Sequence, residues 1–399
     1  MYKNIINQTI VAKSIAIVCT VSLLTACFHE KNEDANVTSS NHYAVVTTNI
    51  AGVDGNTGSG DVSIISLEDY SIDNTNFGTG TDTTVSTNNE HYYHLGRTPE
   101  GNVTKFHINN PENYLSQHKA QETNDVSSNP HKLIVKDENT AFLIRYEKSE
   151  IWIVNPSAAN NETYKTGSID LSNYAGDDGT PEATDAILID NKLYVLMQNL
   201  DRNNGWIPGI GYLAIFDTDN DNEEIDTNSD DSTPHGIALS VTNPNEMDYL
   251  ETNNTLYIAG VGPYSVDYTG GIEAIDTTDY SSNIIIDRTD TSIQSFGQTK
   301  HVAILNSTRG YFVGYVAWQD TGVYSFNPTT GEIDDNPLLV NKDISDIEIG
   351  PLGDLWVANR SDFGITIFST VDNTVTQELI STGTVKPSDI EFISVEQSN

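Results

Sequence analysis

The most constraining feature of this 399-residue chain is a strand-like segment that recurs seven times. Each copy alternates apolar and polar residues, many of them β-branched or aromatic, and a second apolar segment precedes each copy, from His42–Asn49 to Leu355–Arg360. Such alternation between Gly, Pro, Asn and Asp turns predicts short antiparallel strands. The copies start 41 to 61 residues apart, at Gly60, Gly101, Glu150, Gly211, Gly271, Gly322 and Gly364.

The repeating unit is clearest between residues 343 and 380, where four short strands are separated by polar turns. One four-stranded meander cannot bury both of its faces, so it must stack on others of its kind. Seven units at this spacing predict an all-β fold, a seven-bladed β-propeller of four-stranded antiparallel blades over residues 42–399. The first copy lacks an innermost strand, and Pro387–Ile393 has the pattern of one without a blade after it. We therefore predict that the C-terminal strand completes the first blade and closes the ring.

Residues 1–26 have the pattern of a cleaved signal peptide, with two lysines before an apolar run too short to span a bilayer. The run ends in Leu24-Thr-Ala-Cys27, which resembles the bacterial lipobox; this implies a diacylated Cys27 held in a lipid bilayer, with residues 27–41 as a flexible tether. Phe28 after the cysteine implies the outer membrane. The other cysteine, Cys19, lies in the signal peptide, so we expect no disulfide in the mature domain.

The net charge argues against two classes of partner. The formal charge of the chain is −38, and it becomes −40 when the two lysines of residues 1–26 are removed. Such a surface repels nucleic acid and anionic lipid headgroups. The chain also lacks the G-x-S-x-G, H-E-x-x-H, P-loop and C-x-x-C-H motifs, so we assign no catalytic residue.

The expected first residues of the innermost strands are all Asp or His. One interpretation is a ring of ligands at the mouth of the central channel for calcium or another divalent metal. The other is that each side chain accepts hydrogen bonds from nearby backbone N–H groups. The seven residues are Asp82, His131, Asp185, Asp248, His301, Asp346 and Asp389.

Four of the six arginines fall at the ends of second strands or in the following loops, on the same face as this ring: Arg97, Arg145, Arg202 and Arg360. Guanidinium groups suit carboxylate or phosphate ligands, or else they neutralise the ring acids. Bulky aromatic residues occupy long loops of that face, and with the arginines they form our predicted ligand-binding set: Trp206, Tyr264, Tyr268 and Trp318. Replacing Arg145 or Arg360 with Ala is expected to weaken an anionic or mixed-charge ligand roughly tenfold, at little cost in stability.

The acidic segment 217–226 resembles a calcium loop, but Asn222 and Asn228 replace the Gly and Glu that the EF-hand requires. It coincides with a hairpin on the opposite face, where turn chemistry already explains Asp and Asn.

The segment Ser345–Asn359, SDIEIGPLGDLWVAN, resembles the repeat of YVTN/NHL-type seven-bladed propellers. Lipid-anchored propellers of that superfamily include surface proteins that capture vitamin B12 for TonB-dependent transporters. The resemblance implies a non-enzymatic ligand-capture or protein-interaction lipoprotein of the outer membrane, with such a transporter as its partner. The alternatives are a metal-dependent lactonase-like hydrolase and an envelope assembly scaffold.

Lipid anchoring is testable at one residue. Replacing Cys27 with Ser removes the acylated thiol, so the protein is expected to move from the membrane fraction to the soluble fraction. Immunoblots of fractions washed in high salt measure this. A Cys27→Ser protein that stays with the membranes after the wash would contradict the lipobox interpretation.

Overall fold

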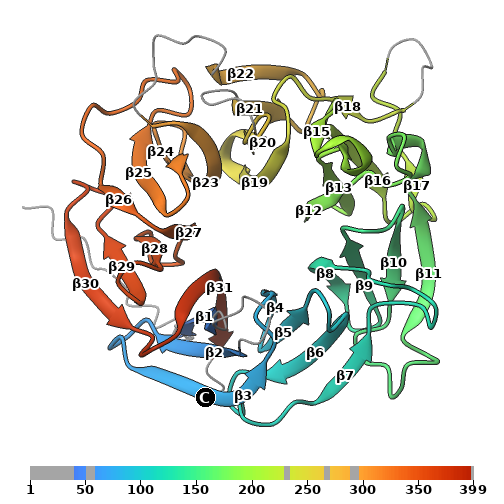
Figure 1. The fold of residues 1–399 in the computed structure, drawn as a ribbon, viewed down its shortest axis with the longest axis horizontal. Coiled ribbons are helices and arrows are strands. Elements are labelled where there is room, and N and C mark those ends of the chain that lie inside the picture. Colours follow the sequence, from blue (N-terminus) through green and yellow to red (C-terminus); the bar gives the residue numbers. More distant parts are fainter. Residues whose placement is uncertain (1–39, 51–58, 229–233, 265–269, 288–295, 397–399) are drawn as a thin grey trace, which may run out of the picture. The chain divides into compact units, whose positions relative to one another are not determined.

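The computed structural model describes residues 40–50, 59–228, 234–264, 270–287 and 296–396, all within one compact unit, Ser39–Asn399. Figure 1 shows its sheets arranged as blades around a common centre. Seven antiparallel sheets, each with four successive strand positions, follow one another along the chain. This confirms the predicted seven-bladed β-propeller. Among the described residues, none forms a helix with the length and hydrophobicity that a membrane crossing requires.

The strands of blades 1 to 7 occupy four successive positions from the channel outward. The innermost strands are β31 (Lys386–Glu396), β4 (Thr83–Asn88), β8 (Pro130–Asp137), β12 (Ala183–Ile189), β19 (Pro244–Leu250), β23 (Gln298–Asn306) and β27 (Ile344–Ile349). The second strands are β1 (Ser40–Ile50), β5 (His91–Gly96), β9 (Thr140–Arg145), β13 (Lys192–Met197), β20 (Thr255–Gly260), β24 (Arg309–Ala317) and β28 (Leu355–Asn359).

The third strands coincide with the repeated segment of the sequence. They are β2 (Ser59–Ser66), β6 (Asn102–His107), β10 (Glu150–Val154), β16 (Tyr212–Asp217), β21 (Gly271–Asp276), β25 (Asp320–Phe326) and β29 (Gly364–Phe368). The outermost strands are β3 (Ile72–Thr79), β7 (Ser116–Lys119), β11 (Lys165–Asp170), the short β17 (Glu223–Glu224) and β18 (Ile237–Ala238), β22 (Ser282–Asp287), β26 (Leu339–Lys342) and β30 (Val375–Ser381).

The long loop of blade 4 adds a small ribbon, β14 (Leu200–Asp201) with β15 (Ile207–Pro208). Three single-turn 3₁₀ helices complete the fold: η1 (Ser172–Tyr174), η2 (Arg202–Asn204) and η3 (Glu251–Asn253).

The hydrophobic core is divided into seven clusters, one between each pair of neighbouring blades. Strand alternation explains this arrangement. In β28, Leu355 and Val357 pack against blade 6, while Trp356 and Ala358 pack against blade 1. Because both faces of a blade are buried, its strands are apolar at successive positions, and every blade depends on two neighbours.

The ring closes as predicted. Strand β31 pairs antiparallel with β1 from Ser40↔Glu396 to Asn49↔Lys386, so the end of the described chain supplies the innermost strand of blade 1. Ile390 then joins the cluster between blades 7 and 1, and Ile393 joins the cluster between blades 1 and 2. Closure therefore completes two of the seven hydrophobic interfaces.

Six of the seven innermost strands carry a register shift near their first residues, where one or two residues have no partner on the second strand. Such β-bulges bend a strand and re-aim its side chains. The unpaired residues are His131, Thr184, Asn245, the Lys300–His301 pair, Ser345 and Ser388.

Closure predicts a large effect of truncation. Deleting residues 386–399 removes β31, which opens blade 1 and exposes the edges of two sheets. The truncated protein is expected to aggregate or to lose its cooperative unfolding transition, as measured by thermal unfolding with light scattering. A truncation that melts like the full chain would contradict closure through β31.

Candidate functional site at the channel mouth

A cavity of about 600 Å³ lies where the innermost strands begin. Its wall contains the unpaired residues of all six bulges. In five blades the wall also contains a charged residue that directly follows the bulge: Lys132, Asp185, Glu246, Asp346 and Asp389. The bulges thus turn the first residues of the innermost strands toward the channel. This arrangement defines the candidate site, which we call the channel mouth.

Several of these carboxylates join neighbouring blades. Asp185 accepts hydrogen bonds from its own successor Ala186 N (2.9 Å) and from Met247 N of the next blade (3.0 Å). Asp346 likewise accepts from Ile347 N (2.9 Å) and from Ile390 N of the next blade (2.7 Å).

The same pattern continues around the ring. Asp248 accepts from Ile304 N in blade 6 at 2.6 Å. Asp389 accepts from Val85 N (2.8 Å) and Thr84 Oγ1 (2.5 Å) in blade 2. The backbone-bonding interpretation of these acids therefore describes four of the seven predicted ring residues. Their bonds run mainly between blades, because an innermost strand has no further strand to satisfy its channel-facing N–H groups.

All seven predicted ring residues line this cavity, but several of them lie off the position directly after a bulge. Asp248 lies two residues after Glu246, which directly follows the bulge of blade 5, and both residues line the cavity. Asp82 precedes β4, is 42% exposed and pairs with Arg97 at 3.4 Å. In His131, Nε2 lies 2.6 Å from Arg97 Nη2 and Nδ1 lies 3.3 Å from Thr184 O, so both ring nitrogens have partners.

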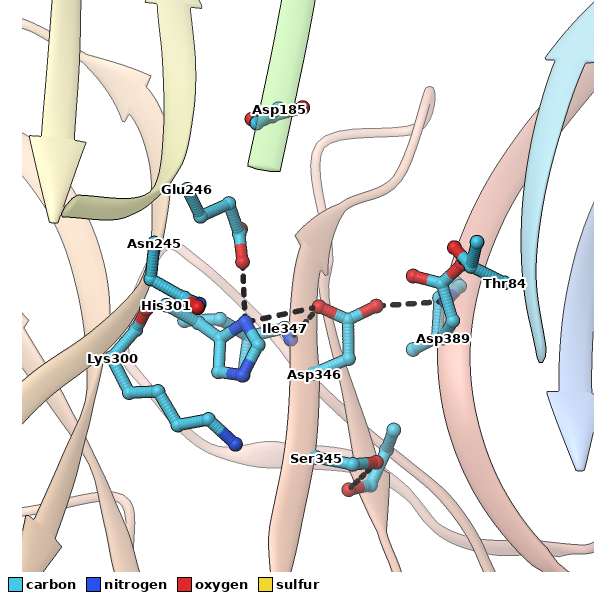
Figure 2. A network of polar contacts seen from close by, with 12 residues as sticks. Thr84, Asp185, Asn245, Glu246, Lys300, His301, Ser345, Asp346, Ile347 and Asp389 are labelled. Atoms are coloured by element: carbon cyan, nitrogen blue, oxygen red, sulfur yellow. Dashed lines mark hydrogen bonds and ion pairs between the residues drawn. The ribbon is translucent and has the colours of Figure 1, made fainter. Parts of the chain in front are cut away.

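Glu246, His301 and Asp346 are brought together from blades 5, 6 and 7. Each offers one ligand atom, and the three atoms lie within 4.8 Å of one another. Figure 2 shows the carboxylates of Glu246 and Asp346 directed at the same nitrogen of the His301 ring. Sequence analysis named two of these residues and missed Glu246.

Burial and mutual repulsion change the protonation of the channel mouth. Burial, reinforced by neighbouring acids, raises the pKa of Glu246, Asp346 and Glu348 well above the ordinary value. Burial also raises the pKa of Asp248 to about 6. Burial opposes the charge of Lys132, but Glu391 at 2.8 Å and Asp185 at 4.0 Å raise the pKa of this lysine well above normal.

Each of the four predicted arginines has an acidic partner. Arg97 pairs with Asp82, and Arg360 Nε lies 3.3 Å from Asp343 Oδ2; both arginines line the channel mouth. Arg202 Nε lies 2.9 Å from the buried Glu182, and its guanidinium lies over the ring of Trp206 at 5.4 Å.

Arg145 lies away from the cavity lining. Its side chain is 1% exposed, its Nη2 lies 2.6 Å from Glu150, and its guanidinium lies 4.1 Å from the centroid of the Trp152 ring. These contacts give Arg145 a packing role in blade 3.

Three of the four predicted aromatic residues lie on the surface. The fourth, Tyr268, is outside the described residues. Trp206 is 44%, Tyr264 59% and Trp318 79% exposed. In the acidic hairpin, Asp217 accepts a hydrogen bond from Asp219 N, and Asp219 pairs with Lys136 at 2.7 Å. Turn chemistry and an ion pair thus describe the hairpin acids.

The site residues that sequence analysis missed are Lys132, Glu246, Lys300 and Glu348. A usable signal was present, because a small polar residue precedes the ring acid in four blades. The pairs are Thr184-Asp185, Asn245-Glu246, Ser345-Asp346 and Ser388-Asp389.

Comparison with known proteins defines the class by fold. No family model matches the chain, and no curated protein matches its sequence. A Lactobacillus plantarum protein of known structure aligns over 88% of this chain and 99% of its own, with 10% identity and a TM-score of 0.58. Hydrazine synthase of Kuenenia stuttgartiensis aligns over 81% and 92%, with 12% identity and a TM-score of 0.53. The dihydro-heme d1 dehydrogenase NirN aligns over 85% of this chain and 66% of its own, with 14% identity and a TM-score of 0.50. At these identities the likeness shows the propeller fold alone.

The contrast between Arg145 and Arg360 is testable. Arg145→Ala leaves a cavity beside Trp152 and removes the partner of Glu150, so it should lower the free energy of unfolding by about 2–4 kcal/mol. Arg360→Ala breaks a partly exposed pair and should cost less than about 1 kcal/mol. Urea unfolding of both variants measures this, and equal losses would contradict the packing role of Arg145.

Proposed function

We propose that this protein is a non-enzymatic capture propeller whose channel mouth binds a ligand through a cationic group. The carrying observation is the charge of the cavity wall. It holds seven Asp or Glu side chains against four Lys or Arg side chains, a formal charge of −3 when every acid is counted as ionised and His as neutral. Like charges in a partly enclosed space repel one another more strongly than in water, so an entering cation is stabilised there.

The Lys and Arg side chains of the wall also favour a cationic ligand over an anionic one, because three of the four already pair with an acid. Arg97 contacts Asp82, Lys132 contacts Glu391, and Arg360 contacts Asp343. Lys300 is the exception: within the described residues its ammonium has no ion pair or hydrogen bond. A ligand that presents both a cationic and an anionic group would use the acid surplus and Lys300 together.

The rim of the channel supplies further contact surface. The Arg202 guanidinium lies 5.3 Å from the centroid of the Tyr146 ring and 5.4 Å from that of the Trp206 ring, and the Tyr146 ring stacks on His131 at 4.4 Å. This series leads from the exposed Trp206 to His131 in the cavity wall. Aromatic side chains are common contact groups in small-molecule sites, where a few polar groups fix the orientation of the ligand.

The cellular setting of the proposal is the one implied by the lipobox: an acylated Cys27, the outer membrane, and a transporter or another envelope protein as partner. The two alternatives have their own assays. Lactone hydrolysis by the metal-loaded protein tests the hydrolase, and pull-down from solubilised membranes tests the assembly scaffold.

Cation capture is testable at those acids of the wall that accept no hydrogen bond from a backbone N–H group of the next blade. In the double variant Glu246→Gln/Glu348→Gln, the wall loses two carboxyl groups that a bound cation would favour in their ionised form, without loss of the Asp-mediated contacts. At pH 7.5, calcium, magnesium and the polyamine spermidine should raise the melting temperature of the wild type, and this rise should be largely lost in the double variant. A ligand at 100 times its Kd stabilises by about 2.7 kcal/mol.

The control is Glu378→Gln on the exposed outer strand β30, which should respond like the wild type. The protein should be monitored by thermal unfolding at fixed ionic strength, so that general screening is constant. Failure of every cation to stabilise the wild type, or an equal loss in Glu378→Gln, would contradict the proposal.

A further inference from the structure

Three ligand atoms from three successive blades converge at one point of the channel mouth. Glu246 Oε2 is hydrogen-bonded to His301 Nδ1, and Asp346 Oδ1 lies 3.7 Å from the same nitrogen. All three atoms lie within 4.8 Å of one another. Two carboxylates directed at one imidazole nitrogen form a donor set with the negative charge that a divalent cation neutralises.

His301 is also incompletely satisfied. Its side chain is 11% exposed, and its buried Nε2 has no hydrogen-bond partner among the described residues. An unpaired buried ring nitrogen is costly, since it has lost water without gaining a partner. Nε2 could therefore bind an ion without losing a hydrogen bond, and rotation of the ring decides which of its two nitrogens faces the ion.

The geometry of the three residues fits a small ion after modest side-chain movement. Tetrahedral ligands about 2.0–2.2 Å from a metal are about 3.4 Å apart. Asp346 Oδ1, 3.7 Å from His301 Nδ1, is already near this spacing. The hydrogen-bonded Glu246 Oε2 and His301 Nδ1 would have to separate, and the widest of the three separations, at most 4.8 Å, would have to shrink. Glu246 and His301 are long enough to make this adjustment, while Asp346 stays fixed by Ile347 N and Ile390 N.

We propose that Glu246, His301 and Asp346 form a site for a divalent first-row transition metal, with Zn²⁺ as the representative ion. An imidazole nitrogen in the donor set favours such a metal over calcium or magnesium, which prefer oxygen ligands alone. Three protein ligands leave a coordination position open toward the cavity. The inference rests on the proposed cation capture and specifies the ion that the channel mouth selects.

The site would also brace the ring. Its ligands come from the innermost strands of blades 5, 6 and 7, and the second oxygen of Asp346 holds Ile390 N in blade 1. A bound ion therefore links four blades, including the one closed by β31. We expect Zn²⁺ to stabilise the protein more than an equal concentration of calcium does.

The test uses the full-length purified protein after treatment with a chelator. Isothermal titration calorimetry with ZnCl₂ should show one strong site in the wild type. His301→Gln should weaken that site by about 100-fold or more, because loss of groups that merely orient ligands already costs 10–100-fold. The matched control is His235→Gln beside the acidic hairpin, which should bind Zn²⁺ like the wild type.

Three results separate the two proposals. If His301→Gln loses Zn²⁺ binding but keeps its stabilisation by calcium and spermidine, both proposals are supported. If it binds Zn²⁺ as tightly as the wild type, the metal site is overturned and cation capture stands. If no cation binds the wild type, both are overturned.

X-ray absorption of the Zn²⁺-loaded wild type requires no variant, and it covers the case in which His301→Gln fails to fold. The expected shell has one imidazole with oxygen donors at about 2.0–2.2 Å. A shell of oxygen atoms alone would overturn the role of His301.

Discussion

The structure depends on hydrogen bonds between acidic side chains of one innermost strand and backbone N–H groups of the next. Seven innermost strands converge on the channel, and each has a second strand on one side only. Their channel-facing N–H groups need acceptors that no sheet supplies. Asp185, Asp248, Asp346 and Asp389 supply them across four of the blade interfaces, and Ser86 Oγ does the same for Leu133 N between blades 2 and 3.

This solution has an electrostatic consequence. An Asp that bonds to the next blade also leaves its charge at the channel, where other acids lie nearby. The raised pKa of Asp346, Glu246 and Glu348 reflects burial together with that crowding. Lys132, bonded to Glu391, relieves one side of the ring, but the wall keeps its surplus of acid. The residues that join the blades therefore also create an attraction for a cation.

Much of the fold could be predicted because it is set by local periodicity. Alternating segments at regular spacing indicated seven blades, and the unmatched strand Pro387–Ile393 indicated closure. The site was less accessible, since a β-bulge shifts which residue faces the channel without changing the apolar pattern. In blade 5 this shift concealed Glu246, which lines the cavity together with the predicted Asp248.

The arginines show a second limit of sequence reasoning. Their position after the second strands indicated a common face, but their partners depend on loop paths that periodicity does not describe. Arg202 meets Glu182 across a loop, and Arg145 folds onto Trp152 within its own blade. Charge alone therefore left open whether the arginines bind a ligand or neutralise acids, and the structure gives each of the four an acidic partner.

The most direct measurement is anomalous X-ray diffraction from crystals of the chelator-treated protein soaked in a zinc salt, recorded on both sides of the zinc absorption edge. The account predicts one strong anomalous peak at the channel mouth, within bonding distance of Glu246, His301 and Asp346. A peak at the hairpin of residues 217–226 with none in the channel, or no ordered peak at all, would contradict it.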